Sequence, residues 1–171
     1  MIRISTGLKF AAVAAVLVLA ACTEKPKAVE TAPPPVSTNT STTTSNIVPG
    51  SAEDLRVNVG DTVHFDYDQY AIKDEDRSTL QRQAAWLQKY PSVRVTVEGH
   101  CDERGTREYN LALGARRANA VKEYLVSLGV SSARVDTISY GKERPICSES
   151  DESCWAQNRR GVTTITAGAA S

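Results

Sequence analysis

Apolar side chains recur at strand or helix spacing along the C-terminal two thirds of the chain. Residues 62–67 form a β-branched and aromatic stretch, which predicts a short strand. Residues 74–90 carry Leu80, Ala84 and Leu87 at helical spacing, which predicts an amphipathic helix. The pattern therefore opens with a strand followed by a helix.

The same order repeats in the next segment. Val93, Val95 and Val97 alternate with polar residues, as in a strand with one wetter face. A second helix is predicted to begin after Thr106, whose hydroxyl can cap the free amides. It is expected to end at Gly129, because glycine suits the left-handed conformation that closes many helices.

Two further strands complete the pattern, at residues 135–140 and 161–166. The order βαβαββ is typical of an α/β two-layer sandwich. We expect both helices to lie on one face of a mixed four-stranded sheet. The folded domain is predicted to occupy residues 58–171.

The N-terminal segment has the pattern of an export signal. Arg3 and Lys9 supply positive charge, and residues 10–21 form an uninterrupted run of apolar and small side chains. This run has twelve residues, whereas a membrane-spanning helix needs about 20. The pattern therefore predicts a cleaved signal peptide at residues 1–21.

The last residues of this segment, Leu19-Ala20-Ala21-Cys22, resemble the lipobox of bacterial lipoproteins. The resemblance implies an S-diacylglycerol and an N-acyl chain on Cys22, and two or more acyl chains anchor a protein stably. Thr23, rather than an aspartate, follows the cysteine, which in that class of protein implies the periplasmic face of the outer membrane. The alternative is an ordinary signal peptide with a chance cysteine at its end.

Residues 22–57 form the predicted lipidated N-terminus and tether. Between Thr31 and Asn46, twelve of sixteen residues are serine, threonine or proline. Such a segment buries too little apolar surface to offset the entropy lost on folding, so we expect it to be disordered. A tether of about 35 residues could reach on the order of 110 Å when stretched.

The balance of charge narrows the class of partner. The chain has 20 basic and 20 acidic residues, and neither sign forms a long run. A non-specific binder of nucleic acid or of an anionic surface needs excess positive charge. Nucleic acid is therefore not an expected partner, and the ligand must be sought at a local site.

The cysteines predict one disulfide. An exported chain folds in an oxidising compartment, and Cys147 and Cys154 lie seven residues apart in a polar, turn-rich stretch. A disulfide between them is favoured over a metal site, because no second pair of ligands is at hand. Cys101 follows a strand and is expected to be a small buried side chain.

Residues 99–121 carry the candidate site. They form a predicted strand end, a polar loop that begins with Asp102, and a helix that bears Arg117. Asn110 and Arg117 are seven residues apart, close to two helical turns, so they share one helix face. An acid and a base are thus expected to flank one cleft, and helical phase favours Arg117 over the neighbouring Arg116.

This segment resembles the signature of the OmpA C-terminal-like superfamily, and the chain looks most like its peptidoglycan-associated lipoprotein branch. The likeness covers residues 61–166 and includes further motifs at residues 65–68, 139–145 and 158–160. It implies binding of diaminopimelate in the stem peptide of peptidoglycan, without a cofactor. It also implies TolB and other Tol proteins as partners, within the Tol-Pal system for envelope integrity and cell division.

The resemblance also implies roles for single residues. Asp102 would bind the ammonium group of diaminopimelate, and Arg117 its carboxylate, because a guanidinium can hold a carboxylate through two parallel hydrogen bonds. Asn110 would add a hydrogen bond. The walls of the site would be lined by Tyr67, Asp68 and Leu113. Arg160 would close the rim.

Two other classes of function stay open. A cell-wall hydrolase could use Asp102, Glu103 and His100, but adjacent side chains tend to point apart and a glycosidase pair must flank one bond. His64 is the other histidine of the chain, so the histidines do not form a convincing metal cluster. A purely protein-binding envelope lipoprotein would not require an acid and an arginine on one groove. We expect a binding protein rather than an enzyme.

Overall fold

The computed structural model describes residues 47–171. The predicted signal peptide, the predicted lipidation site at Cys22 and the tether up to residue 46 lie outside these residues and stay predictions. Within the described part, no helix is both long enough and apolar enough to cross a membrane.

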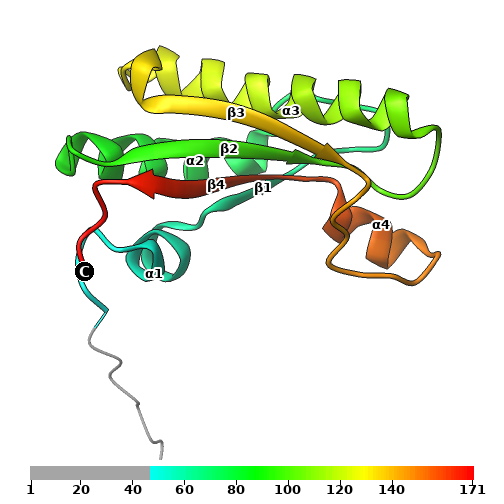
Figure 1. Ribbon diagram of the computed structural model, residues 1–171, viewed down its shortest axis with the longest axis horizontal. Helices are drawn as coiled ribbons and strands as arrows, with labels where there is room; N and C mark the ends of the chain where they lie inside the picture. Colours follow the sequence, from blue (N-terminus) through cyan, green and yellow to red (C-terminus); the bar gives the residue numbers. More distant parts are fainter. Residues whose placement is uncertain (1–46) are drawn as a thin grey trace, which may run out of the picture. The chain divides into compact units, whose positions relative to one another are not determined.

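Four strands form one mixed sheet, with β1 (Thr62–His64) and β3 (Val135–Gly141) at its edges. The central strands are β4 (Arg160–Ala167) and β2 (Arg94–His100). β4 pairs antiparallel with β1 and with β2, and β2 pairs parallel with β3 (Figure 1). The predicted strand and helix order around a mixed four-stranded sheet is confirmed.

The helices α2 (Asp74–Lys89) and α3 (Arg107–Ser127) cover one face of this sheet (Figure 1). The core lies between the two layers, where Val95 and Val97 of β2 are 0% exposed. Their neighbour Thr96 is only half-buried, because successive side chains of a strand point to opposite faces. The predicted α/β two-layer sandwich is therefore confirmed.

Two glycines let α3 lie against the backbone of β2. A side-chain carbon on Gly99 would overlap with the main-chain carbonyl of Gly114 in α3, and one on Gly114 would overlap with the Ser139 hydroxyl. A larger residue at either position would push the helix off the sheet. This contact fixes the height of α3 above the end of β2.

The ends of α3 follow the sequence prediction. The Thr106 hydroxyl accepts a hydrogen bond from the Tyr109 amide at 3.2 Å. Gly129 follows the C-cap residue Leu128 and has a φ of +95°. Glycine adopts this left-handed conformation without a steric cost, so the predicted end of the helix is confirmed.

The ordered domain begins earlier than predicted. α1 (Ala52–Asp54) and a π-helical turn, η1 (Leu55–Val59), occupy the end of the segment that was assigned to the tether. Leu55 is 2% exposed and belongs to the core. The predicted tether boundary at residue 57 is therefore wrong.

The two ends of the described chain meet where β2 begins and β4 ends. The Ala170 amide donates a hydrogen bond to the Gly50 carbonyl at 3.2 Å. The Ser92 hydroxyl, just before β2, donates to the Gly168 carbonyl at 3.4 Å. α1 therefore lies at the end of the sheet where β2 begins, and β2 runs from there towards the opposite end.

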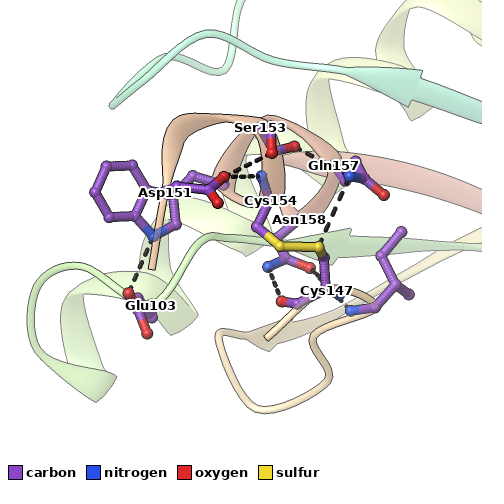
Figure 2. Close-up of a disulfide and its surroundings, with 9 residues drawn as sticks. Glu103, Cys147, Asp151, Ser153, Cys154, Gln157 and Asn158 are labelled. Atoms are coloured by element: carbon purple, nitrogen blue, oxygen red, sulfur yellow. Dashed lines mark hydrogen bonds between the residues drawn. A yellow bond between two sulfur atoms is a disulfide. The ribbon is translucent and has the colours of Figure 1, made fainter. Parts of the chain in front are cut away.

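Two further short helices were not predicted, η2 (Ser132–Arg134) and α4 (Glu152–Asn158). α4 lies at the end of the sheet where β2 and β3 finish and β4 starts (Figure 1). A disulfide between Cys147 and Cys154 ties α4 to the loop before it, with Cα atoms 5.1 Å apart (Figure 2). This pairing confirms the prediction, and Cys101 is buried, as expected.

Candidate functional site

A cavity of about 200 Å³ opens at the end of the sheet where β2 leads into α3. Six of the seven predicted ligand-binding residues line it: Tyr67, Asp68, Asp102, Asn110, Leu113 and Arg117. Four lining residues were not predicted: Cys101, Arg104, Gly105 and Tyr109. The walls come from the loop after β1, the loop after β2 and the first half of α3.

Arg117 is fully buried at this cavity, with 0% of its surface exposed. Its Nε, Nη1 and Nη2 atoms donate hydrogen bonds to the main-chain carbonyls of Gln69, His100 and Asp66, at 2.8, 2.8 and 3.0 Å. Burial removes the guanidinium from water and thereby lowers its pKa.

No carboxylate in residues 47–171 forms an ion pair with Arg117, since all its protein partners are neutral carbonyls. These three bonds also leave guanidinium donors free. A buried cation without a counter-ion favours an incoming anion, because the anion restores the solvation that burial removed. The cavity is therefore suited to bind a carboxylate at Arg117.

Asp102 supplies the opposite charge in the same cavity, although it is only 4% exposed. Its carboxylate accepts hydrogen bonds from the main chain and side chain of Arg104 and, at 3.4 Å, from Arg159 Nη1. Burial alone would raise the pKa of Asp102, but the hydrogen bonds and charge of Arg104, with Arg159, outweigh burial and lower it. Asp102 is therefore ionised at neutral pH.

Arg117, and not Arg116, faces the cavity. The Arg116 guanidinium is exposed and lies over the rings of Tyr70 and Tyr109, with its central carbon 5.5 and 6.0 Å from their centroids. Helical phase had favoured this assignment, because Arg117 is two turns after Asn110.

Asp68 and Asn110 shape the loops around the cavity. Asp68 has a φ of +56°, a left-handed conformation that aspartate tolerates better than most residues, and its carboxylate accepts a hydrogen bond from the Tyr109 hydroxyl. Asn110 Nδ2 donates to the carbonyls of Arg104 and Thr106 at 2.8 and 3.0 Å. The amide nitrogen of Asn110 is thus engaged in holding the loop after β2.

Arg160 does not line the cavity, so its predicted place at the rim is wrong. It is the first residue of β4, and its guanidinium donates to the carbonyls of Asn158 and Arg144 at 3.4 and 3.2 Å. Arg159, one residue earlier, contacts Asp102 instead. The sequence alone did not indicate which of these two adjacent arginines is the last residue before β4 and therefore lies next to Asp102.

The sequence did contain a signal for the unpredicted residue Arg104. It lies two residues after Asp102 within the motif at 99–121, where an acid and a base are neighbours in a tight polar loop. Aspartate side chains commonly accept from the backbone two residues ahead, and the Arg104 amide donates to Asp102 Oδ1 at 3.1 Å.

His100 is buried next to the cavity but does not line it. It is 2% exposed, its ring nitrogens have no hydrogen-bond partner in the described residues, and its ring centroid lies 5.4 Å from that of Tyr140. The nearest carboxylate oxygen, from Glu98, is 3.4 Å from Nε2. Burial, with the charges of Arg160 and Arg144, lowers the His100 pKa to about 4.

The stability of the domain should therefore fall as the pH drops from about 6.5 towards about 4. In this window the unfolded chain binds a proton at His100 and the folded chain does not, so acid favours unfolding. One such group contributes at most about 1.4 kcal/mol per pH unit. Urea unfolding across this range should show a slope that His100→Phe reduces, most clearly above about pH 5, where carboxyl groups contribute little. The exposed His64→Phe is the control and should keep the slope, whereas an unchanged slope in His100→Phe would contradict this assignment.

The fold and cavity correspond to a known family. Residues 64–159 match the model of the OmpA family. The structure superposes on the crystal structure of the peptidoglycan-associated lipoprotein from Burkholderia pseudomallei with a TM-score of 0.61 and 43% identity, over 62% of this chain and 90% of that one. For the C-terminal domain of Helicobacter pylori MotB the TM-score is 0.59 and the identity 26%, over 63% and 84% of the chains. The class is thus an OmpA-like domain.

Curated relatives give the narrower family. The chain is 60% identical over 117 residues to a protein named peptidoglycan-associated lipoprotein from Mesorhizobium japonicum, which covers 68% of this chain and 70% of the relative. A protein of the same name from Pseudomonas aeruginosa is 54% identical over 99 residues, 58% of each chain. The chain belongs to the peptidoglycan-associated lipoprotein family.

Proposed function

We propose that the cavity binds the diaminopimelate residue of the peptidoglycan stem peptide, and that the protein attaches the outer membrane to the cell wall without covalent bonds. The observation that carries this proposal is that one cavity holds an ionised aspartate and a buried arginine that forms no ion pair within residues 47–171. The names of the relatives, which say that they are associated with peptidoglycan, support the choice of ligand.

The chemistry of diaminopimelate fits this pair of charges. The free end of its side chain carries an ammonium group and a carboxylate on one carbon. Arg117 offers unused donors for the carboxylate, and a planar guanidinium can hold it with two parallel bonds. Asp102 offers its negative charge to the ammonium group. A cavity of about 200 Å³ has room for such a head group but not for a sugar chain.

Attachment to the membrane is the second half of the proposal. The lipobox at residues 19–22 supplies an acylated Cys22 on the periplasmic face of the outer membrane, and the segment up to residue 46 supplies reach. TolB and other Tol proteins are the proposed protein partners, in the Tol-Pal system for envelope integrity and cell division. These parts rest on the family resemblance.

The geometry supports binding rather than hydrolysis. Glu103 is exposed, accepts a hydrogen bond from Trp155 Nε1 at 3.0 Å and does not line the cavity. His100 packs against Tyr140. The three groups considered for a hydrolase are therefore not arranged around one bond, and we propose that the protein is not an enzyme.

Titration with two stem peptides tests the proposed ligand. L-Ala-γ-D-Glu-meso-diaminopimelate should bind, and the matching peptide with lysine should bind much more weakly, because lysine lacks the carboxylate that Arg117 would hold. Calorimetry or NMR shift changes measure both affinities. Equal affinities, or no binding of the first peptide, would reject the proposal.

Asp102→Asn should weaken binding of the diaminopimelate peptide by about 10- to 100-fold, since it removes a hydrogen-bonded charge worth about 1.5–3 kcal/mol. Co-sedimentation with isolated sacculi gives an independent measurement. Arg77→Gln is the control, because Arg77 forms an exposed ion pair with Asp74 in α2 and does not line the cavity. Undiminished binding by Asp102→Asn would exclude Asp102 from the site.

A further inference from the structure

Arg104 lies over Asp102 at the cavity, held between two aromatic rings. The central carbon of its guanidinium is 4.1 Å from the centroid of the Tyr67 ring and 4.0 Å from that of the Trp155 ring. Its Nη2 donates to Asp102 Oδ2 at 2.6 Å, and its Nε donates to Oδ1 at 3.1 Å. Arg104 therefore already holds the acid that is proposed to receive the ammonium group of the ligand.

Asp102 has no acceptor position to spare. A carboxylate offers about four lone-pair positions, and Asp102 accepts two hydrogen bonds on each oxygen, three from Arg104 and one from Arg159. An ammonium group that binds Asp102 must displace one of these donors. The ligand and an arginine of the protein thus compete for the same carboxylate.

Arg104 is the donor that can leave. The Arg159 side chain is 7% exposed, and it also donates to the Phe65 carbonyl at 3.0 Å and to Glu152. The Arg104 side chain is 28% exposed and lines the cavity, and its one other ion pair within residues 47–171 is a distant one, with Glu152 at 3.9 Å. Its position depends on Asp102 and on the two rings.

Trp155 is fixed by a braced loop. It lies in α4, whose N-cap Asp151 accepts from the Cys154 amide at 3.0 Å and whose Cys154 is bonded to Cys147. Asn158 bonds both the amide and the carbonyl of Cys147, and Glu103 accepts from the indole nitrogen; Figure 2 shows the disulfide with these neighbours. The loop thus presents a rigid ring to one face of the Arg104 guanidinium.

We propose that Arg104 is a built-in competitor for the ammonium group of the ligand, and that Trp155 is a positioning residue that sets the strength of this competition. Ligand binding then requires the Arg104 side chain to move off Asp102 and out from between the rings. The free energy needed to displace Arg104 makes the binding free energy of the ligand less favourable, so it weakens the affinity. This inference rests on the proposed function, because it concerns the same cavity and the same ligand group.

Two variants and their combination test the proposal by calorimetry on the full chain with L-Ala-γ-D-Glu-meso-diaminopimelate. Arg104→Gln should lower the Kd about tenfold, since a charge-assisted hydrogen bond that opposes binding is lost. Trp155→Leu should lower it about three- to tenfold, as expected for one cation–π contact. In the Arg104→Gln background, Trp155→Leu should have no further effect. Arg77→Gln should leave the Kd unchanged.

The combination separates a positioning role from a general structural one, because a loosened loop would act with or without Arg104. Tighter binding by both single variants, without additivity, supports the proposal. Weaker binding by Arg104→Gln would overturn it and make Arg104 a ligand contact. A gain from Trp155→Leu that persists in the Arg104→Gln background would overturn the role of Trp155.

A second perturbation covers the case in which Trp155→Leu does not fold. Cys147→Ser with Cys154→Ser releases the loop but keeps both rings, and it should lower the Kd in the same direction, again only when Arg104 is present. An unchanged Kd in this variant and in Arg104→Gln would overturn the proposal. If the unmodified protein does not bind the peptide at all, the proposed function fails, which is a different result from binding that these variants leave unchanged.

Discussion

Replacing Arg117 with leucine should abolish detectable binding of the diaminopimelate peptide and also destabilise the domain. Binding should weaken by about 2–5 kcal/mol, because the carboxylate of the ligand would enter a buried site without a cation. The free energy of unfolding should fall by about 3 kcal/mol or more, because the carbonyls of Asp66, Gln69 and His100 lose their donor, and each unsatisfied group costs about 1–3 kcal/mol. Calorimetry and urea unfolding measure the two effects.

Two matched variants separate charge from geometry at Arg117. Arg117→Lys keeps the positive charge, but a single ammonium group cannot reach three carbonyls and a carboxylate in one plane. Arg117→Lys should therefore lose most of the binding and most of the stability that Arg117→Leu loses. Arg116→Leu removes the neighbouring exposed arginine and should change neither measurement appreciably. Equal losses in Arg116→Leu and Arg117→Leu, or full binding by Arg117→Leu, would contradict the assignment of Arg117.

Gly99→Ala should produce the largest loss of stability among substitutions that add a single methyl group. The new carbon would overlap with the backbone carbonyl of Gly114, so α3 as a whole would have to move away from β2. Overpacking of this kind costs about 1–3 kcal/mol and more where backbone must shift, so we expect a loss of about 3 kcal/mol. Ligand binding should fall as well, because α3 carries Arg117 and β2 leads to Asp102.

Gly161→Ala is the control for this prediction. Its new carbon would meet the methyl groups of Val121 and Val63 and the ring of Phe65, which are side chains that can shift by a few tenths of an ångström. The loss of stability should therefore be clearly smaller than for Gly99→Ala when both are followed by urea unfolding. A Gly99→Ala protein as stable as Gly161→Ala would show that the close contact of α3 with β2 is not rigid.

Elements with a strong local pattern could be predicted from the sequence. The alternation of Val93, Val95 and Val97 gave β2, and Thr106 and Gly129 gave the ends of α3, because each of these signals acts within a few residues. Three cavity residues, Asp102, Asn110 and Arg117, could be placed together for the same reason. Asp102 directly follows a strand, and Asn110 and Arg117 lie on one face of the helix that comes after it.

Contacts between distant segments could not be predicted in this way. α1 was missed because it has only three residues and because one of the contacts that fix it is remote in sequence: the Asp54 carboxylate accepts a hydrogen bond from Trp86 Nε1, 32 residues later, at 2.8 Å. Arg160 was misplaced because its role came from the family resemblance, and the contacts that separate it from Arg159 are also remote: Arg159 reaches Asp102, 57 residues earlier. The contact of Trp155 with Arg104 could not be predicted either, because it forms only when the chain folds and brings α4 next to the loop after β2.

The opposite placement of α1 and the cavity has a mechanical consequence. In the proposed arrangement, tension from the membrane enters the domain at residue 47, and the cell wall holds the domain beyond the far end of β2. The pull is therefore directed along the strands. Bonds between antiparallel strands run perpendicular to the strand direction, so this load shears many of them together instead of breaking them one after another. The proposed arrangement would therefore orient the domain so that it resists stretching of the envelope.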